Sequence, residues 1–460
     1  MIFSKFNLWV KDYPGQGEYL LFNTRTQALI KINQRLKEEL DKISGHQVTP
    51  SPSLGTPFGR RSPGHQLEEN LSALKESGII VEDNNEEEAK LKDFFEQLKY
   101  QSDTLPFEVT ILTTYNCNFK CVYCFEEQVK ENLFLDKDAS DLIIKWIIKK
   151  AEKKNFQRIF LVYYGGEPLL NTLPIYRISS RIKQWSESRG IDFGFSIITN
   201  GSLISPELIA DFLNLGLKEI RITIDGDREA HNQKRPFLDG RPTFDLILNN
   251  IKSVIDKVKI SIAGNFDRQN LESIPRLLDY LTEESLLYKL NKIDFAPLVP
   301  RLGPKANPGA IELSECLSFI GKEGLFKEVI NIKKELLRRK LKIITGLAIN
   351  ACSLLMQDGG VTIDPKGDIY KCNSLLGYPE FSVGNVVEDN FNPRFQEFLN
   401  IDAWNKCPQD CPYIPMCQGG CRFFSYLENK NFMDLSCKRE YFERVTPELI
   451  KLEYERLIQE

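Results

Sequence analysis

The chain has 460 residues, with 60 lysines and arginines against 64 aspartates and glutamates, so its formal net charge is −4. Such a balance excludes a general electrostatic attraction to nucleic acid or to membrane surfaces. No apolar run approaches the roughly 20 residues that a membrane-spanning helix needs, and no signal-peptide pattern opens the chain, so we expect a soluble, cytoplasmic protein. The 11 cysteines indicate metal or redox chemistry rather than a disulfide framework.

The first segment, residues 1–101, predicts a small α+β module. Alternating apolar and polar residues favour strands, and longer amphipathic stretches favour helices. The predicted order is strand, strand, helix, helix, strand, over Phe3–Val10, Glu18–Ile32, Gln34–Ile43, Gln66–Ser77 and Gly78–Glu82. Residues 45–66 are rich in Ser, Pro and Gly and have few apolar side chains, so we expect a mobile insertion there.

The second segment, residues 102–342, alternates nearly continuous apolar strands with amphipathic helices. This alternation predicts an α/β fold with a parallel sheet, and six such units make a partial (β/α)6 barrel. The expected strands are Phe107–Thr114, Arg158–Gly165, Asp192–Thr199, Glu219–Asp225, Val258–Gly264 and Lys292–Leu298. In folds of this type the chemistry gathers at the C-terminal ends of the strands.

Three cysteines follow the first of these strands at C-x₃-C-x₂-C spacing: Cys117, Cys121 and Cys124. A short loop at a strand end lets three thiolates converge on one point. Three thiolates suit a cubane iron–sulfur cluster with one iron left free for a substrate or cofactor. Zinc is the alternative, but it usually takes two C-x₂-C pairs or adds histidines, and the 3 histidines here are remote in sequence.

Short polar motifs stand at the ends of the next strands. Gly165-Gly166-Glu167-Pro168 follows the second strand, where the glycines let the backbone approach a ligand and Glu167 offers an acceptor for an ammonium group. Thr199-Asn200-Gly201 follows the third strand, and Asp225-Gly226 follows the fourth. These polar side chains could bond a ribose or a carboxylate; simple turn chemistry is the alternative.

The third segment, residues 343–460, is irregular, contains seven cysteines and ends in a helical tail. Seven thiolates exceed what one zinc site takes, so we expect more than one metal cluster. The remaining thiol, Cys316, lies on an apolar helical pattern and is interpreted as a core residue. The seven are Cys352, Cys372, Cys407, Cys411, Cys417, Cys421 and Cys437.

The cysteine loop, with Tyr123 directly before its third cysteine, resembles that of the radical S-adenosylmethionine (SAM) enzymes. The resemblance implies that the free iron chelates SAM and that the reduced cluster cleaves it to a 5′-deoxyadenosyl radical. His231-x₃-Arg235 resembles a further family segment, which implies that Arg235 binds the methionine carboxylate and that His231 is structural. The implied SAM contacts are Gly165, Gly166, Glu167, Thr199, Asn200, Asp225, Arg235 and Asn265.

The late cysteines resemble the SPASM extension of this family, with one departure: three residues instead of two separate Cys407 from Cys411. The resemblance implies two auxiliary [4Fe-4S] clusters. The second would take Cys407, Cys411, Cys417 and Cys437. The first would take Cys352, Cys372 and Cys421 and lack a fourth cysteine, because Gly346 stands where some relatives have one.

Together these motifs resemble radical SAM/SPASM maturases of ribosomally made peptides, and Glu18–Thr24 looks most like those acting on Nif11-type precursors. That implies a winged-helix-like module that binds the precursor's leader, then backbone excision of a tyramine unit, or a thioether or carbon–carbon crosslink. Implied partners are the precursor peptide, a flavodoxin or ferredoxin as electron donor, and a small recognition protein.

Three other functions stay open: formylglycine formation in sulfatases, chemistry on a small molecule, and a non-enzymatic iron–sulfur scaffold. The sequence identifies no catalytic base. Tyr163, Tyr164 and Asp225 are guesses for residues that line the barrel mouth.

Overall fold

The computed structural model describes residues 1–45, 72–100, 106–124, 126, 132–154, 156–298, 323–388 and 390–459. They form two compact units. The barrel unit comprises residues 99–343 and 352–401, and the terminal unit comprises residues 1–98, 344–351 and 402–460. All but the first residue of the predicted insertion at 45–66, half of the predicted helix at 66–77, and Cys316 lie outside the described residues.

A nine-stranded sheet forms the centre of the barrel unit, in the order β11-β10-β9-β8-β7-β6-β12-β13-β14. Strands β6 to β11 and β12 are parallel, and β13 and β14 are antiparallel to their neighbours. The sheet confirms the predicted α/β fold with a large parallel sheet. The bounds are β6 Phe107–Leu112, β7 Arg158–Tyr164, β8 Asp192–Thr199, β9 Leu217–Thr223, β10 Lys259–Phe266, β11 Lys292–Pro297, β12 Val361–Ile363, β13 Asp368–Tyr370 and β14 Gly384–Asn385.

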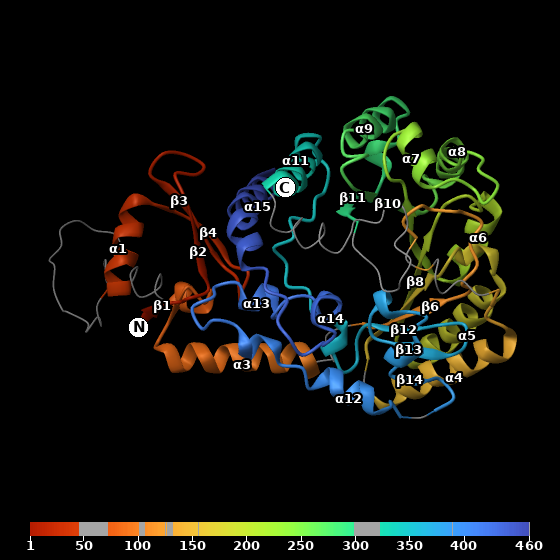
Figure 1. Cartoon of the computed structure of the whole chain (residues 1–460), viewed down its shortest axis with the longest axis horizontal. Helices are drawn as coiled ribbons and strands as arrows, with labels where there is room; N and C mark the ends of the chain where they lie inside the picture. The colour runs from red at the N-terminus through yellow and green to blue at the C-terminus, as the bar shows by residue number, and fades with distance from the viewer. Residues whose placement is uncertain are drawn as a thin grey trace. The chain divides into compact units, whose positions relative to one another are not determined.

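Helices connect the parallel strands and follow the outside of the sheet (Figure 1). Their ends carry ordinary caps: Asp136 accepts a hydrogen bond from Ala139 N at the start of α4, and Gly190 ends α5 with φ 68°. The bounds are α4 Lys137–Lys153, α5 Leu173–Arg189, α6 Pro206–Leu215, α7 Arg228–Lys234, α8 Phe244–Val254, α9 Ser273–Glu283, α11 Glu323–Arg338 and α12 Pro393–Leu399.

The two faces of the parallel sheet differ in burial. Residues that point toward the helices, such as Ile220 and Ile222 of β9, are at most 1% exposed. Many of the alternate residues on the opposite face, which we call the inner face, are partly or fully exposed, although Leu112 and Ser261 are buried there. Tyr163 points into the helix-covered core and bonds Ser179 at 2.8 Å, so our guess that it lines the barrel mouth is wrong. Tyr164 lies on the inner face.

The terminal unit contains a three-stranded antiparallel sheet in the order β2-β3-β4, and a separate β1–β5 pair. The single strand predicted over Glu18–Ile32 is wrong, because this segment forms the hairpin of β3 and β4. The bounds are β1 Ile2–Phe3, β2 Asn7–Lys11, β3 Glu18–Asn23, β4 Leu29–Asn33, β5 Ile80–Val81, α1 Gln34–Gly45, α3 Asn84–Tyr100, α13 Ile414–Cys417, α14 Arg422–Asn429 and α15 Arg439–Gln459.

The N-terminal module and the C-terminal segment pack against each other in this unit. Tyr13 packs edge-on against Tyr454 of α15 and donates a hydrogen bond to Glu455, and Phe95 of α3 stacks on Trp404 with ring centroids 4.0 Å apart. These contacts join the N-terminal module to the C-terminal tail in one hydrophobic unit. Within the described residues, every helix is too short or too polar to cross a membrane.

Candidate active site

The cysteine loop follows β6 and is held in place by the segment after α7. Lys120 N donates to Pro236 O at 2.9 Å, Val122 N donates to Lys234 O at 3.0 Å, and Leu238 N donates to Asn118 O at 3.0 Å. These backbone bonds form a short ladder that fixes the loop at the C-terminal end of the sheet, as the sequence predicts. Cys117, Cys121 and Cys124 are all partly exposed, so a cofactor can reach their thiols.

Burial has the largest effect on the ionisation of the Cys117 thiol. Burial raises its pKa to about 12, while the backbone N–H of Phe119, 3.4 Å from Sγ, acts in the opposite direction. Asn200 Nδ2 lies 3.9 Å from the same sulfur. Because only a thiolate binds iron, the cluster's own positive charge must drive its deprotonation.

Glu167 joins the ends of β7 and β8. Its side chain is fully buried, and burial raises its pKa. Oε1 accepts hydrogen bonds from Leu169 N at 3.0 Å and from Thr199 Oγ1 at 2.7 Å, and Oε2 accepts from Asn200 N at 2.7 Å. Oε2 therefore keeps one lone pair for a further donor, which is compatible with the predicted ammonium contact.

The two glycines before Glu167 pack closely against the backbone that leads into the cysteine loop. A Cβ on Gly165 would lie 2.3 Å from Thr114 O, and one on Gly166 would lie 2.3 Å from Asn116 O. Glu167 N also donates to Asn116 O at 2.8 Å. The glycines are therefore needed for close contact with the backbone that leads into the cysteine loop, because that backbone fills the space a side chain would occupy. Their predicted contact with SAM stays a prediction.

We predict that Gly166→Ala weakens the cysteine loop. The new methyl group would overlap the backbone of Asn116, and overpacking of this kind costs about 1–3 kcal/mol of unfolding free energy. Chemical denaturation and the iron content after anaerobic reconstitution measure the effect. Gly15→Ala is the control, because its Cβ would meet only the flexible end of Glu18 at 3.0 Å. Equal unfolding free energies in both variants would contradict this explanation.

Tyr123 connects three of the predicted SAM contacts. Its hydroxyl accepts from Arg235 Nη1 at 2.6 Å and from Asn265 Nδ2 at 3.2 Å, and it donates to Asp225 Oδ2. Asn265 N donates to the other carboxylate oxygen of Asp225 at 2.8 Å. Burial raises the pKa of Tyr123 well above its usual range, so the phenol stays protonated. The structure brings these residues together beside the cysteine loop.

Arg235 is the positive group of this network. It is 8% exposed, it interacts electrostatically with Cys121 and Asp225, and its buried Nε has no hydrogen-bond partner among the described residues. A buried guanidinium N–H without an acceptor is costly. Three thiols together with this cation therefore suit a cluster and a carboxylate-bearing cofactor, and the residues fit the implied groups.

We predict that Tyr123→Phe destabilises the protein by about 1–3 kcal/mol, because it leaves the buried polar atoms of Arg235 and Asp225 short of a partner. Urea unfolding of the cluster-free protein measures this without interference from iron. Tyr288→Phe is the matched control, because Tyr288 is 67% exposed. An unfolding free energy unchanged in Tyr123→Phe would mean that the hydroxyl network contributes nothing.

Several site residues escaped the sequence analysis. Asn118 accepts from Asn200 Nδ2 at 2.8 Å and donates to Ser202 Oγ at 2.9 Å, which connects the cysteine loop to the end of β8. Asn270 Nδ2 donates to the Asp225 carbonyl oxygen. His231, expected to be structural, is buried, and its Nδ1 accepts from Asp225 N at 3.3 Å. Only the polar residue types at strand ends could have signalled them.

Four late cysteines interact with one another in the terminal unit. Burial raises the pKa of Cys407 to about 12, with further contributions from Cys417, Cys411 and Cys437. Cys411 and Cys417 likewise have Cys437 among their charged neighbours. Four thiols that lie close enough to interact form a donor set suited to an iron–sulfur cluster, and they are the residues of the predicted second auxiliary set.

Arg422 organises the backbone around these cysteines. Its fully buried guanidinium donates to the carbonyl oxygens of Phe432 at 2.9 Å, Asp434 at 2.7 Å and Gly420 at 3.0 Å. Cys421 precedes Arg422 at the start of α14. It belongs to the terminal unit, whereas Cys352 and Cys372 belong to the barrel unit, so the predicted first auxiliary set stays a prediction.

Cys352 and Cys372 begin two short 3₁₀ helices, and their chain neighbours are bonded to each other: Ser353 Oγ donates to Lys371 O. The Lys371 ammonium is fully buried and donates to Gly359 O. Burial lowers the pKa of Lys371 to about 7, although Asp358 and Cys352 act in the opposite direction. Among the described residues, no three His, Cys, Asp or Glu side chains are arranged to hold a single metal ion.

Residues 111–281 match the Radical SAM superfamily. Over 330 residues the chain is 24% identical to a cysteine-type anaerobic sulfatase-maturating enzyme of Clostridium novyi (strain NT), which covers 67% of this chain and 85% of that enzyme. The solved structure of anSMEcpe with bound AdoMet and Kp18Cys peptide has a TM-score of 0.57 at 18% identity and covers 75% of this chain and 98% of that one. Streptococcus suis SuiB bound to precursor peptide SuiA has a TM-score of 0.52 at 14% identity and covers 95% of this chain and 99% of that one.

The two structural likenesses show a shared fold, and the sequence matches cover the cysteine loop and the strands that surround it. SAM and the first [4Fe-4S] cluster are thereby implied as cofactors. The chain is a radical S-adenosylmethionine enzyme with relatives among the sulfatase-maturating enzymes.

Proposed function

We propose that this enzyme removes a hydrogen atom from a ribosomally made precursor peptide, which then undergoes backbone excision or forms a thioether or carbon–carbon crosslink. The observation that carries the proposal is the N-terminal module. The likeness to SuiB, solved with its precursor peptide, extends over 95% of this chain and so includes most of that module, whereas the likeness to anSMEcpe covers 75%. A module of this kind suits a leader peptide.

Strand β4 is the proposed docking edge for that leader. It pairs with β3 on one side only, over Leu29 to Asn33, so its other backbone edge has no partner among the described residues. An extended peptide can add to such an edge as a fourth strand. Lys31, exposed on β4 and paired with Glu18 at 2.9 Å, would flank the added strand.

The bound cluster and SAM would supply a carbon radical that abstracts hydrogen. The chain's own residues would hold and orient the cofactor: Cys117, Cys121 and Cys124 bind the cluster, Glu167 accepts from the SAM ammonium group, and Arg235 pairs with the SAM carboxylate. Gly165, Gly166, Thr199, Asn200, Asp225 and Asn265 complete the surroundings. Two auxiliary clusters, an electron donor such as flavodoxin or ferredoxin, and a small recognition protein belong to the same proposal.

Mass spectrometry tests this function. The enzyme is incubated without oxygen with SAM, a reductant and a candidate precursor peptide, chosen from short reading frames that neighbour its gene. We expect loss of a tyramine unit or loss of hydrogen atoms in that peptide. An unmodified peptide, with its stereochemistry also unchanged, would overturn the proposal.

A sulfatase-maturating activity is the second candidate, because the Clostridium novyi enzyme matches 67% of this chain at 24% identity. The same assay distinguishes the two functions when a peptide with a sulfatase-type cysteine or serine replaces the precursor. Conversion of that residue to formylglycine would favour the second candidate. Conversion of the precursor alone would favour the first.

A further inference from the structure

Two cations stand side by side on the inner face of the sheet, below the proposed SAM site. Arg221 of β9 is in register with Ser261 of β10, and Ser261 is in register with Lys292 of β11. Neighbouring strands lie about 4.8 Å apart, so the two Cα atoms are separated by roughly 10 Å. Long side chains that start at this spacing, on the same face, can reach one small anion between them.

Both cations lack a counter-charge. Arg221 is exposed and Lys292 partly exposed, and neither forms an ion pair or side-chain hydrogen bond within the described part of the chain. The nearest carboxylate along β9, Glu219, already accepts hydrogen bonds from Ser261 and from Asn291. Two such cations stand on the face where the substrate would lie, whereas the exposed Arg158 and Arg228 of the same unit pair with Asp192 and Asp245.

A third cation comes from helix α11. Lys333 interacts electrostatically with both Lys292 and Asp294 of β11. Burial lowers the pKa of Lys333, and the positive charge of Lys292 adds to this effect, whereas Asp294 opposes it. Together Arg221, Lys292 and Lys333 carry three positive charges against the two of Glu219 and Asp294. A small anion would therefore be attracted to this part of the inner face.

We propose that Arg221 and Lys292, assisted by Lys333, bind a carboxylate group of the substrate and so select an acidic substrate. Asn265, which bonds Asp225 and Tyr123, lies four residues beyond Ser261 on the same strand, or roughly 13 Å away at 3.3 Å per residue. The carboxylate would thus be held on the same strand face as Asn265, roughly 13 Å from the proposed SAM contacts, and would fix the position of the substrate. This subsite rests on the proposed peptide substrate.

The carboxylate has two sources in a peptide: an Asp or Glu side chain, or the free C-terminus. Four pools of octapeptides that carry an uncharged fluorophore distinguish them. In every pool a fixed central Glu or Gln is surrounded by positions randomised among uncharged residues. The Glu peptides and the Gln peptides are each made with a free C-terminus and with an amidated one, which gives the four pools. Fluorescence anisotropy measures binding of each pool to the full chain, reconstituted without oxygen and saturated with SAM.

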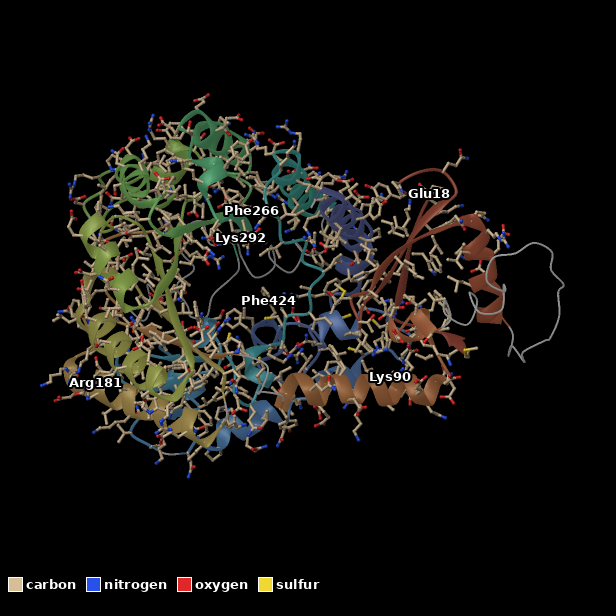
Figure 2. The ribbon with its side chains drawn as sticks, turned by 180° about the vertical axis from the view of Figure 1, so that it is seen from behind. Glu18, Lys90, Arg181, Phe266, Lys292 and Phe424 are labelled. Atoms are coloured by element: carbon tan, nitrogen blue, oxygen red, sulfur yellow. The ribbon has the colours of Figure 1, made fainter. Side chains whose placement is uncertain are left out.

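We expect one carboxylate-bearing pool to bind about tenfold more tightly than the neutral Gln-amide pool, because hydrogen bonds between charged groups are roughly twice as strong as neutral ones. The double variant Arg221→Gln/Lys292→Gln should remove this preference. The control is Lys153→Gln/Arg181→Gln, which changes the net charge equally on exposed positions of α4 and α5 (Figure 2 labels Arg181 and Lys292). Iron content and thermal unfolding verify that both double variants fold.

Each outcome decides between the two proposals. A preference that the Arg221→Gln/Lys292→Gln variant loses and the control retains supports the carboxylate subsite. Equal binding of all four pools, or a preference that survives in that variant, overturns the subsite but leaves the peptide function standing. Failure of every pool to bind, together with an unmodified precursor in the mass-spectrometric assay, overturns both.

Discussion

Replacing Cys117, Cys121 and Cys124 together with alanine should lower the iron content from about twelve to about eight atoms per chain, and it should abolish 5′-deoxyadenosine formation. The three thiols lie on one short loop, which Lys120, Val122 and Leu238 hold by backbone hydrogen bonds. No other described cysteine belongs to this loop. Iron analysis and chromatography of the SAM cleavage products, both after anaerobic reconstitution, measure the two effects.

A loss of radical formation could also follow from a misfolded loop, so Asn118→Ala serves as a comparison. This variant removes the bonds to Asn200 and Ser202 but keeps all three thiols. It should retain about twelve irons while slowing SAM cleavage. If the triple variant still produced 5′-deoxyadenosine, the assignment of this loop to the radical-forming cluster would be wrong.

The regular part of the barrel unit could be predicted from the sequence because its signals are local. Strand β8 has the predicted bounds, Asp192–Thr199, and an amphipathic helix follows it as expected, α6 over Pro206–Leu215. Both have a clear hydrophobic period. Helix α6 also has ordinary caps: the Ser205 side chain accepts a hydrogen bond from Leu208 N, and Gly216 ends the helix with φ 107°. Where hydrophobic period and capping agree, local pattern determines the element.

The hairpin of β3 and β4 was missed because its turn contains no glycine or proline. Asn23 makes the turn instead: its Oδ1 accepts from Arg25 N at 3.1 Å and Thr26 N at 3.0 Å, and Gln27 adopts φ 65°. Such an Asx turn is a side-chain effect within a polar stretch that otherwise continues a strand pattern. The asparagine was the available signal.

The site could be predicted as a set of residues but not as a network. The cysteine spacing and the strand-end motifs indicated Cys117, Glu167 and Asp225, and the family resemblance added Arg235. Nothing local indicates that the hydroxyl of Tyr123 joins Arg235 to Asp225. The same holds for Tyr115, whose hydroxyl donates to Asp364 at 3.0 Å across 249 positions. Strand β12, which brings Asp364 there, has only three residues and pairs with β6 far back in the chain. Long-range pairing of short segments leaves no periodic signal.

The second large effect is expected at the late cysteines. Replacing Cys407, Cys411, Cys417 and Cys437 with alanine should also leave about eight irons per chain, yet SAM cleavage should continue. The reason is that these four thiols interact with one another in the terminal unit, whereas the SAM contacts lie in the barrel unit. Peptide modification should stop, because we propose that this auxiliary cluster would accept the electron that the substrate radical must lose to become a closed-shell product.

Two further variants sharpen this result. Cys316→Ala should leave about twelve irons, because we interpret Cys316 as a core residue rather than a ligand. Cys421→Ala should lower iron independently of the four-cysteine set, because we assign it to the other auxiliary cluster. If the Cys421 variant and the four-cysteine variant lost the same irons, with no further loss when combined, the two predicted ligand sets would have to be merged. Retained peptide modification in the four-cysteine variant would remove that cluster from the reaction altogether.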